Sequence, residues 1–109
     1  MPRLTFVEVI KEFAFALQGE KLKHRFAFTN TGTVDLLLEN VEPACGCTVA
    51  NFTKTAVPPG GKGFVELVFD TEGKLGNQIK IAKVTSNASG PAKILTITSQ
   101  VITEDEIDW

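Results

Sequence analysis

Residues 21–29 read Lys21-Leu22-Lys23-His24-Arg25-Phe26-Ala27-Phe28-Thr29, and this alternation of polar and apolar residues decides the fold class. Side chains of a β-strand point alternately to its two faces. The apolar residues Leu22, Phe26 and Phe28 therefore share one face with His24, while the cationic residues share the other. We expect a strand with one face in a core and one in water.

Turn-forming residues separate similar apolar runs along the rest of the chain. Asn30-Thr31-Gly32-Thr33 predicts a tight reversal, and Pro58-Pro59-Gly60-Gly61 predicts a second break. Together with 21–29, further strands are expected at 4–9, 35–41, 47–52, 64–69, 79–86 and 94–101. About seven short strands in roughly 100 residues are typical of an immunoglobulin-like antiparallel β-sandwich, an all-β fold.

Residues 9–17 leave two structures open. The apolar residues there have the i, i+3, i+4, i+7 spacing of an amphipathic helix, namely Ile10, Phe13, Ala14 and Leu17. However, the segment lacks an N-cap residue and is rich in β-branched and aromatic residues, which favours two extended pieces. We expect the extended structure.

Length and charge limit the classes of protein that the chain can belong to. A chain of 109 residues, 43% of them hydrophobic, fits one domain. We expect the sandwich at residues 1–103 and an acidic tail, or the start of a linker, at 104–109. The net charge of -2 and the scattered lysines disfavour nucleic acid as a partner. No run approaches the roughly 20 apolar residues of a transmembrane helix.

Both cysteines of the chain lie in Cys45-Gly46-Cys47-Thr48. On a regular strand their α-carbons would lie about 6.5 to 7 Å apart, at the limit that a disulfide bridges, and Gly46 allows the bend that would close the bond. Three interpretations stay open. Cys45 and Cys47 are a buried and a rim thiol, or a redox pair, or soft ligands for Cu(I) or zinc with His24 as a further nitrogen donor.

The remaining polar residues form no recognisable catalytic group. A histidine on an apolar strand face, such as His24, is more often a border residue than a base or ligand. No local nucleophile motif is present, so we expect no enzyme and no cofactor. The polar loop 70–77 offers a candidate binding surface through Asp70, Glu72, Lys74 and Asn77.

The order of motifs along the chain resembles one known family. The motifs are Phe-Ala-Phe-Thr-Asn-Thr-Gly at 26–32, Cys-Gly-Cys-Thr at 45–48, Val-Pro-Pro-Gly at 57–60 and Val-Glu-Leu-Val-Phe-Asp-Thr at 65–71. Over nearly its whole length the chain is similar to the bacterial domain-of-unknown-function family DUF1573. Two departures are Glu12 and Ala14 where the family usually has Asp and Gly, and Ser99 where it usually has Gly. They bring into question a tight turn near Phe13 and a bulge in the last strand.

The resemblance implies an immunoglobulin-like sandwich similar to major sperm protein and hydin-type modules. It also implies an exported or lipid-anchored protein of the periplasm or outer membrane, although the chain shows no signal segment and a cytoplasmic relative is the alternative. We expect a non-enzymatic binding or adhesion module that engages a protein or envelope component through loops or a sheet edge. An exposed edge would also allow a homo-oligomer. The alternative is a thiol redox or copper-handling protein that uses Cys45 and Cys47.

Overall fold

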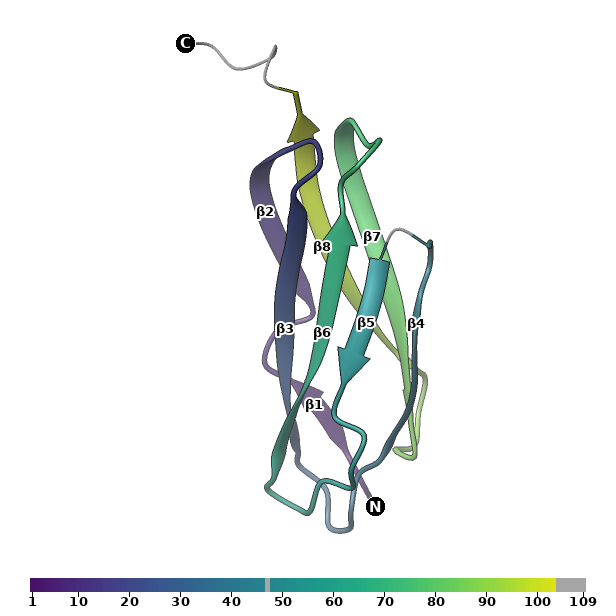
Figure 1. The fold of residues 1–109 in the computed structure, drawn as a ribbon. Coiled ribbons are helices and arrows are strands. Elements are labelled where there is room, and N and C mark those ends of the chain that lie inside the picture. The colour runs from purple at the N-terminus through teal and green to yellow at the C-terminus, as the bar shows by residue number, and fades with distance from the viewer. Residues whose placement is uncertain (47, 104–109) are drawn as a thin grey trace.

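The computed structural model describes residues 1–46 and 48–103, in which all regular structure is β-strand (Figure 1). The strands form two four-stranded sheets that pack face to face. In spatial order the first sheet contains β1 (Leu4–Phe6), β3 (Lys21–Asn30), β6 (Lys62–Asp70) and β5 (Thr48–Phe52), and the second contains β2 (Ile10–Leu17), β8 (Lys93–Ile102), β7 (Gly76–Ser86) and β4 (Leu38–Pro43). The predicted immunoglobulin-like sandwich is confirmed, with eight strands instead of about seven. No helix of the described residues is long and apolar enough to cross a membrane.

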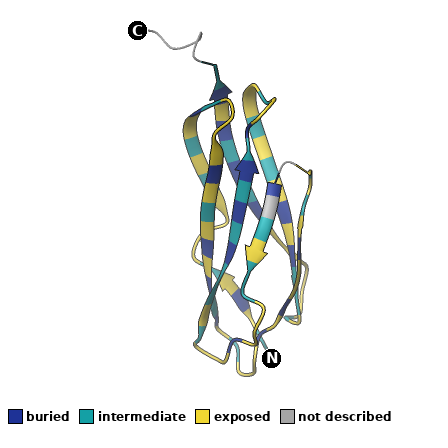
Figure 2. Cartoon of the chain, in the orientation of Figure 1, coloured by how far each residue is buried: buried dark blue, intermediate teal, exposed yellow. Residues whose placement is uncertain are grey.

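Strand β3 has the two faces that its sequence predicts. Leu22, Phe26 and Phe28 are buried, and the cationic residues between them are exposed, so that buried and exposed residues alternate along the strand (Figure 2). The strand pairs antiparallel with β6, where Phe26 lies opposite the buried Val65. Side chains from the inner faces of the two sheets fill the core between them. The core includes Phe26, Phe28, Leu36, Val65, Leu67, Ala82, Val84, Leu95 and Ile97.

The first part of the chain crosses from one sheet to the other. β1 pairs antiparallel with β3 in the first sheet, whereas β2 pairs with β8 in the second sheet and runs parallel to it. All other neighbouring strands are antiparallel. Residues 10–17 are therefore extended, and the helical alternative is wrong.

Strand β2 contains a bulge next to Phe13, where the sequence brought a tight turn into question. The register passes from Phe13 opposite Ser99 to Phe15 opposite Gln100, which leaves Ala14 as the extra residue. The pairing of β8 with β7 continues through Ser99 without a shift. The irregularity thus belongs to β2 and not to the last strand. The hydroxyl of Ser99 is buried and has no hydrogen-bond partner within the described part of the chain.

The strand expected at 35–41 begins later than its apolar run. β4 starts at Leu38, because the fully buried Leu36 instead forms an isolated bridge with Val57. Its amide donates to the Val57 carbonyl at 2.8 Å and its carbonyl accepts from the Val57 amide at the same distance. This bridge closes the space between the sheets before β4 begins.

Asn30, at the end of β3, holds the chain next to the Leu36–Val57 bridge through a fully buried side chain. Its Nδ2 donates to the carbonyls of Val34 at 2.7 Å and Val57 at 2.9 Å. Its Oδ1 accepts from the amides of Gly32 at 2.9 Å and Arg3 at 3.3 Å. One amide side chain therefore connects the N-terminal segment, the turn after β3 and the chain between β5 and β6.

Candidate functional site

The cysteine motif connects the two sheets. Ala44 donates to the Ile81 carbonyl at 2.9 Å, which holds the beginning of the motif on β7 of the second sheet. Thr48 is buried and lies opposite Phe69 of β6 in the first sheet. Cys45 is disulfide-bonded and half-buried, and its Sγ lies 3.9 Å from Thr48 Oγ1. Cys47, the other half of the predicted redox pair, lies outside the described residues.

His24 lies at the border of the core. Its Nε2 is hydrogen-bonded to Glu8 Oε1, and its ring meets the buried Phe26 ring edge-on, with ring centroids 4.7 Å apart. A histidine at the core border was expected, although its partner is a carboxylate. β6 separates His24 on β3 from β5, which follows Cys45, so the structure does not bring these two metal-ligand candidates together. Nowhere in residues 1–46 and 48–103 do three or more potential His, Cys, Asp or Glu ligands gather.

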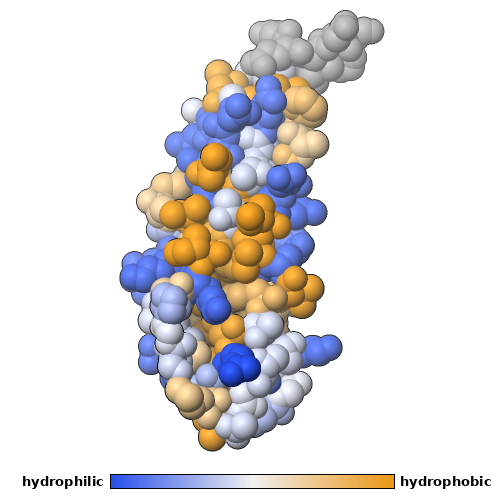
Figure 3. Space-filling model, turned by 180° about the vertical axis from the view of Figure 1, so that it is seen from behind, coloured by the Kyte–Doolittle hydropathy of each residue, from blue (hydrophilic) through white to orange (hydrophobic). Residues whose placement is uncertain are grey.

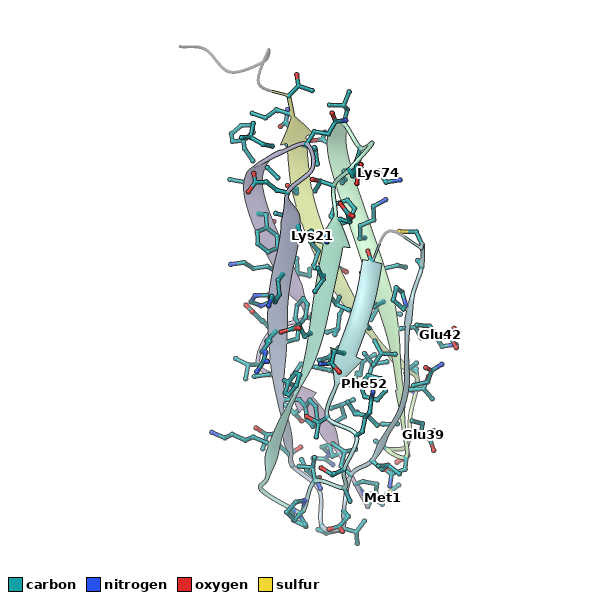
Figure 4. All side chains as sticks on the ribbon, in the orientation of Figure 1. Met1, Lys21, Glu39, Glu42, Phe52 and Lys74 are labelled. Atoms are coloured by element: carbon teal, nitrogen blue, oxygen red, sulfur yellow. The ribbon has the colours of Figure 1, made fainter. Side chains whose placement is uncertain are left out.

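The candidate binding loop is shorter than its sequence suggests. Asp70 is the last residue of β6, and Asn77 already belongs to β7. Asp70 Oδ1 accepts from the Glu72 amide at 3.0 Å, and the Lys74 carbonyl accepts from Gln18 Nε2 at 3.0 Å. Figure 4 shows Lys74 at the opposite end of the sandwich from Met1. The four predicted side chains are exposed or half-exposed at this end.

The buried Thr71 holds this loop in place from below. Its Oγ1 accepts from the Gly19 amide at 2.9 Å and donates to the Glu20 carbonyl at 2.6 Å. The loop is thereby fastened to the turn between β2 and β3. The loop conformation is thus fixed by contacts with the rest of the fold, and a role of its side chains in binding stays a prediction.

A cavity of about 370 Å³ lies at the Met1 end of the sandwich. The N-terminal segment, the turn after β3 and the connection between β7 and β8 line it. Arg3 and Lys93 are the charged side chains of the lining, which includes no carboxylate, histidine or thiol. The cavity therefore offers no pair of side chains for general acid and base catalysis.

The largest unexpected feature is an apolar surface on the outside of the second sheet. We use the term apolar outer face for the exposed residues Ile10, Phe15, Ile79, Ile81 and Ile94, which come from β2, β7 and β8. Between 41% and 69% of each residue is exposed. Figure 3, which views the molecule from behind, shows hydrophobic residues gathered over the middle of this sheet.

The register makes this surface continuous. Thr96 on the central strand β8 lies opposite Ile10 of β2 on one side and Ile81 of β7 on the other. Ile94 and Ile79 lie two residues from Thr96 and Ile81, on the same strand faces. Opposite side chains of neighbouring strands have Cβ atoms about 4.5 to 5.5 Å apart. Four isoleucines thus surround one threonine.

The outer face of the first sheet has a different character. Arg25 Nε donates to Glu66 Oε2 across β3 and β6 at 2.8 Å, and the guanidinium lies 4.3 Å from the centre of the Phe64 ring. The hydrogen bond from Arg25 holds the pKa of the Glu66 carboxyl below its usual value, against an opposing effect of desolvation. Arg25 and Glu66 of this face are thus paired with each other, whereas the isoleucines of the other face are exposed.

The sequence matches one family model, described as a protein of unknown function (DUF1573), over residues 4–101. No curated protein matches it. A protein of unknown function from Porphyromonas gingivalis W83 is similar in structure, with a TM-score of 0.73 and 18% identity over 91% of this chain and 46% of that one. The secreted serine protease VesC of Vibrio cholerae has a TM-score of 0.67 and 15% identity over 90% of this chain and 23% of that one.

A third similar structure is the ASH or PapD-like domain 7 of human CEP192, with a TM-score of 0.68 and 14% identity. The match covers 92% of this chain and 85% of that domain. The identities are low, so these likenesses concern the fold alone. The chain spans less than half the length of the Porphyromonas and VesC chains.

Proposed function

The chain belongs to the DUF1573 family, whose function is unknown, and on that premise we propose that it is a non-enzymatic binding module that engages a protein through its apolar outer face. The exposed isoleucines around Thr96 are the observation that carries this proposal. Contiguous exposed apolar patches of several hundred Å² mark interaction sites in soluble proteins, whereas single exposed apolar residues need no explanation.

The energy of covering this face is large enough to matter. Burying apolar surface gains about 25 cal/mol per Å², so covering one half-exposed isoleucine is worth about 1 kcal/mol. Five residues of the face together supply several kcal/mol before the cost of association is subtracted. A flat sheet face suits a protein surface better than a small molecule, which requires a concave site.

Two observations support a place outside the cytoplasm and within a longer protein. Cys45 is disulfide-bonded, and disulfides persist mainly in oxidising compartments. Similar folds form part of longer chains, one of which is a secreted protease. We therefore propose an extracytoplasmic module that holds a protein or envelope component.

The test compares a change on the apolar outer face with a change outside it. The double variant Ile79→Lys, Ile81→Lys places two charges on the apolar outer face, and Leu75→Lys changes an equally exposed residue in the loop before β7. Immobilised domains are incubated with a cell-envelope extract, and captured proteins are quantified by mass spectrometry. At least one protein held by the wild type and by Leu75→Lys should fall tenfold or more with the double variant. Identical captured proteins for all three domains would contradict the proposal.

A second candidate function is thiol redox or copper handling through Cys45 and Cys47. It is favoured by the disulfide at a half-buried Cys45, because accessible disulfides are the ones that reductants reach. Thiol titration with mass spectrometry, before and after a dithiol reductant and then Cu(I), tests it. Reversible reduction under mild conditions or stoichiometric Cu(I) binding is expected, and a disulfide that resists reduction in the folded protein would exclude this function.

A further inference from the structure

We propose that the apolar outer face binds a second copy of this chain, face to face, about a two-fold axis. This inference rests on the proposed function, because it names the occupant of the same face. It is carried by the positions of two charged residues at the border of the face.

Glu12 and Lys83 lie at diagonally opposite corners of the isoleucine group around Thr96, with Glu12 between Ile10 and Phe15 on the edge strand β2. Glu12 on β2 is opposite Thr98, and Lys83 on β7 is opposite Ile94. Both side chains are exposed. Thr98 and Ile94 lie two residues to either side of Thr96 on β8, and β2 and β7 flank β8 on opposite sides. From strand spacing and rise, each charge is about 8 Å from Thr96, in opposite directions.

This arrangement is complementary to itself. A two-fold axis that lies in the contact plane, perpendicular to the line from Glu12 to Lys83, exchanges the two corners. Glu12 of one subunit then meets Lys83 of the partner subunit, twice in the dimer, while the isoleucines around both Thr96 residues face each other. A two-fold interface requires such a self-complementary patch.

The residue opposite Lys83 on β4 is acidic, as Glu12 is, but it is hydrogen-bonded within its own strand. Glu42 lies opposite Lys83, and its Oε1 accepts from Asn40 Nδ2 at 2.9 Å. Figure 4 shows Glu39 and Glu42 on the β4 side of the molecule. Lys83 therefore stands between the apolar face and an acidic border strand, and is the basic residue at this corner.

The size of the face is typical of a weak dimer. Three strands about 4.8 Å apart and seven residues rising about 3.3 Å each cover roughly 300 Å² before the border residues are added. The total buried area then lies near or below about 1,200 Å², at the low end of specific protein complexes. We expect a dimer with a dissociation constant in the micromolar range, about 10 to 100 μM.

The experiment is a charge-exchange series on the full chain, measured by sedimentation velocity from about 5 to 500 μM, a range that brackets the expected affinity. Glu12→Lys and Lys83→Glu should each weaken dimerisation at least tenfold, because each places like charges at both contacts. The double variant Glu12→Lys, Lys83→Glu should return to within about threefold of the wild type. An equimolar mixture of the two single variants should form a heterodimer, since both of its contacts are then attractive. Glu72→Lys, which makes the same charge change in the loop after β6, should dimerise like the wild type.

Three results would overturn the inference: a wild-type chain that stays monomeric up to 500 μM, single charge reversals without effect, or single variants that fail to associate when mixed. The proposed function is tested separately by the capture experiment with Ile79→Lys, Ile81→Lys. If the chain is monomeric and this variant still loses a captured protein, the proposed function stands and the second copy is excluded. If this variant alters neither dimerisation nor capture, both proposals are wrong.

Discussion

Asn30 provides the sharpest test of how the fold is held together, because its buried side chain makes four hydrogen bonds to backbone groups. The change Asn30→Ala removes all four. The bond to the Val57 carbonyl is fully buried, but this carbonyl keeps the bond from the Leu36 amide, so the loss costs about 0.5 to 1.5 kcal/mol. The other three bonds are partly buried at a turn and cost about 0.5 to 1 kcal/mol each.

The expected loss is therefore about 2 to 4.5 kcal/mol, a large share of the roughly 5 to 15 kcal/mol that stabilises a typical domain. It is measured as the free energy of unfolding in urea, with an unchanged dependence on denaturant. Asn40→Ala is the matched control, because Asn40 is exposed and its Nδ2 bonds only to a nearby side chain on β4. A loss at Asn30 within 1 kcal/mol of this control would refute the reasoning.

Asn30→Asp separates the donor bonds from the acceptor bonds. It keeps an acceptor for the amides of Gly32 and Arg3 but turns a carboxylate toward two carbonyls. Burial raises the pKa of the introduced carboxyl in the folded state, so the proton favours folding. The variant should therefore be least destabilised in acid and lose further stability as the pH rises through the raised pKa. Equal destabilisation at pH 4 and pH 7 would contradict this.

Three further changes test the packing and the charges. Gly63→Ala should cost about 1 to 3 kcal/mol, because its Cβ would lie 2.4 Å from Cζ of the buried Phe28. Ser99→Ala should raise the free energy of unfolding by about 1 kcal/mol, because it removes a buried hydroxyl without a partner. Glu66→Gln should lower the melting temperature at pH 7; since Arg25 lowers the folded-state pKa of Glu66 below 4.5, this difference should disappear as the pH falls through that pKa. A destabilising Ser99→Ala, a neutral Gly63→Ala, or a Glu66→Gln effect that persists in strong acid would each contradict its prediction.

The sandwich was predictable wherever the apolar pattern matched the pairing of the strands. In β3 and β6 the buried apolar residues all lie on one strand face, and Phe26 and Val65 lie opposite each other in the core as the pattern requires. The run 35–41 misled the prediction, because Leu36 is buried in the core at an isolated bridge to Val57 and not in strand β4. The sequence alone does not show whether a buried apolar residue lies in a strand or at an isolated bridge.

The helical spacing in residues 9–17 does not mark one buried face, because Ile10 and Ala14 are exposed whereas Phe13 packs inside. Phe13 and Ala16 both pack inside, three residues apart, because the bulge at Ala14 inserts one residue into a period of two. A strand with one bulge therefore imitates the first turn of a helix. The pairing with β8 that reveals the bulge joins segments more than 80 residues apart and is not visible locally.

The candidate site was only partly predictable. The cysteine motif led to the correct family. The apolar outer face was not predicted, because the exposed Ile79 and Ile81 and the buried Ala82 and Val84 place apolar residues on both faces of the same strand. Such a strand is apolar on both faces and looks like an ordinary core strand. The change of phase within residues 79–84 is the signal that could have found the face. Its continuity with Ile10 depends on the parallel pairing of β2 with β8, which no local pattern shows.

That parallel pairing also determines how the molecule responds to tension. β2 begins toward the Met1 end and β8 leaves at the opposite end, and seven residue pairs join them (Figure 1). A pull on the two ends of the chain would drive these strands past each other along their axes, so that all bonds of the ladder are loaded at the same time. Two antiparallel strands of a hairpin, pulled from their adjacent ends, would instead open one pair at a time. We therefore expect this connection to resist a pull along the strands more strongly than a hairpin does, and the forced-unfolding rate would report that resistance.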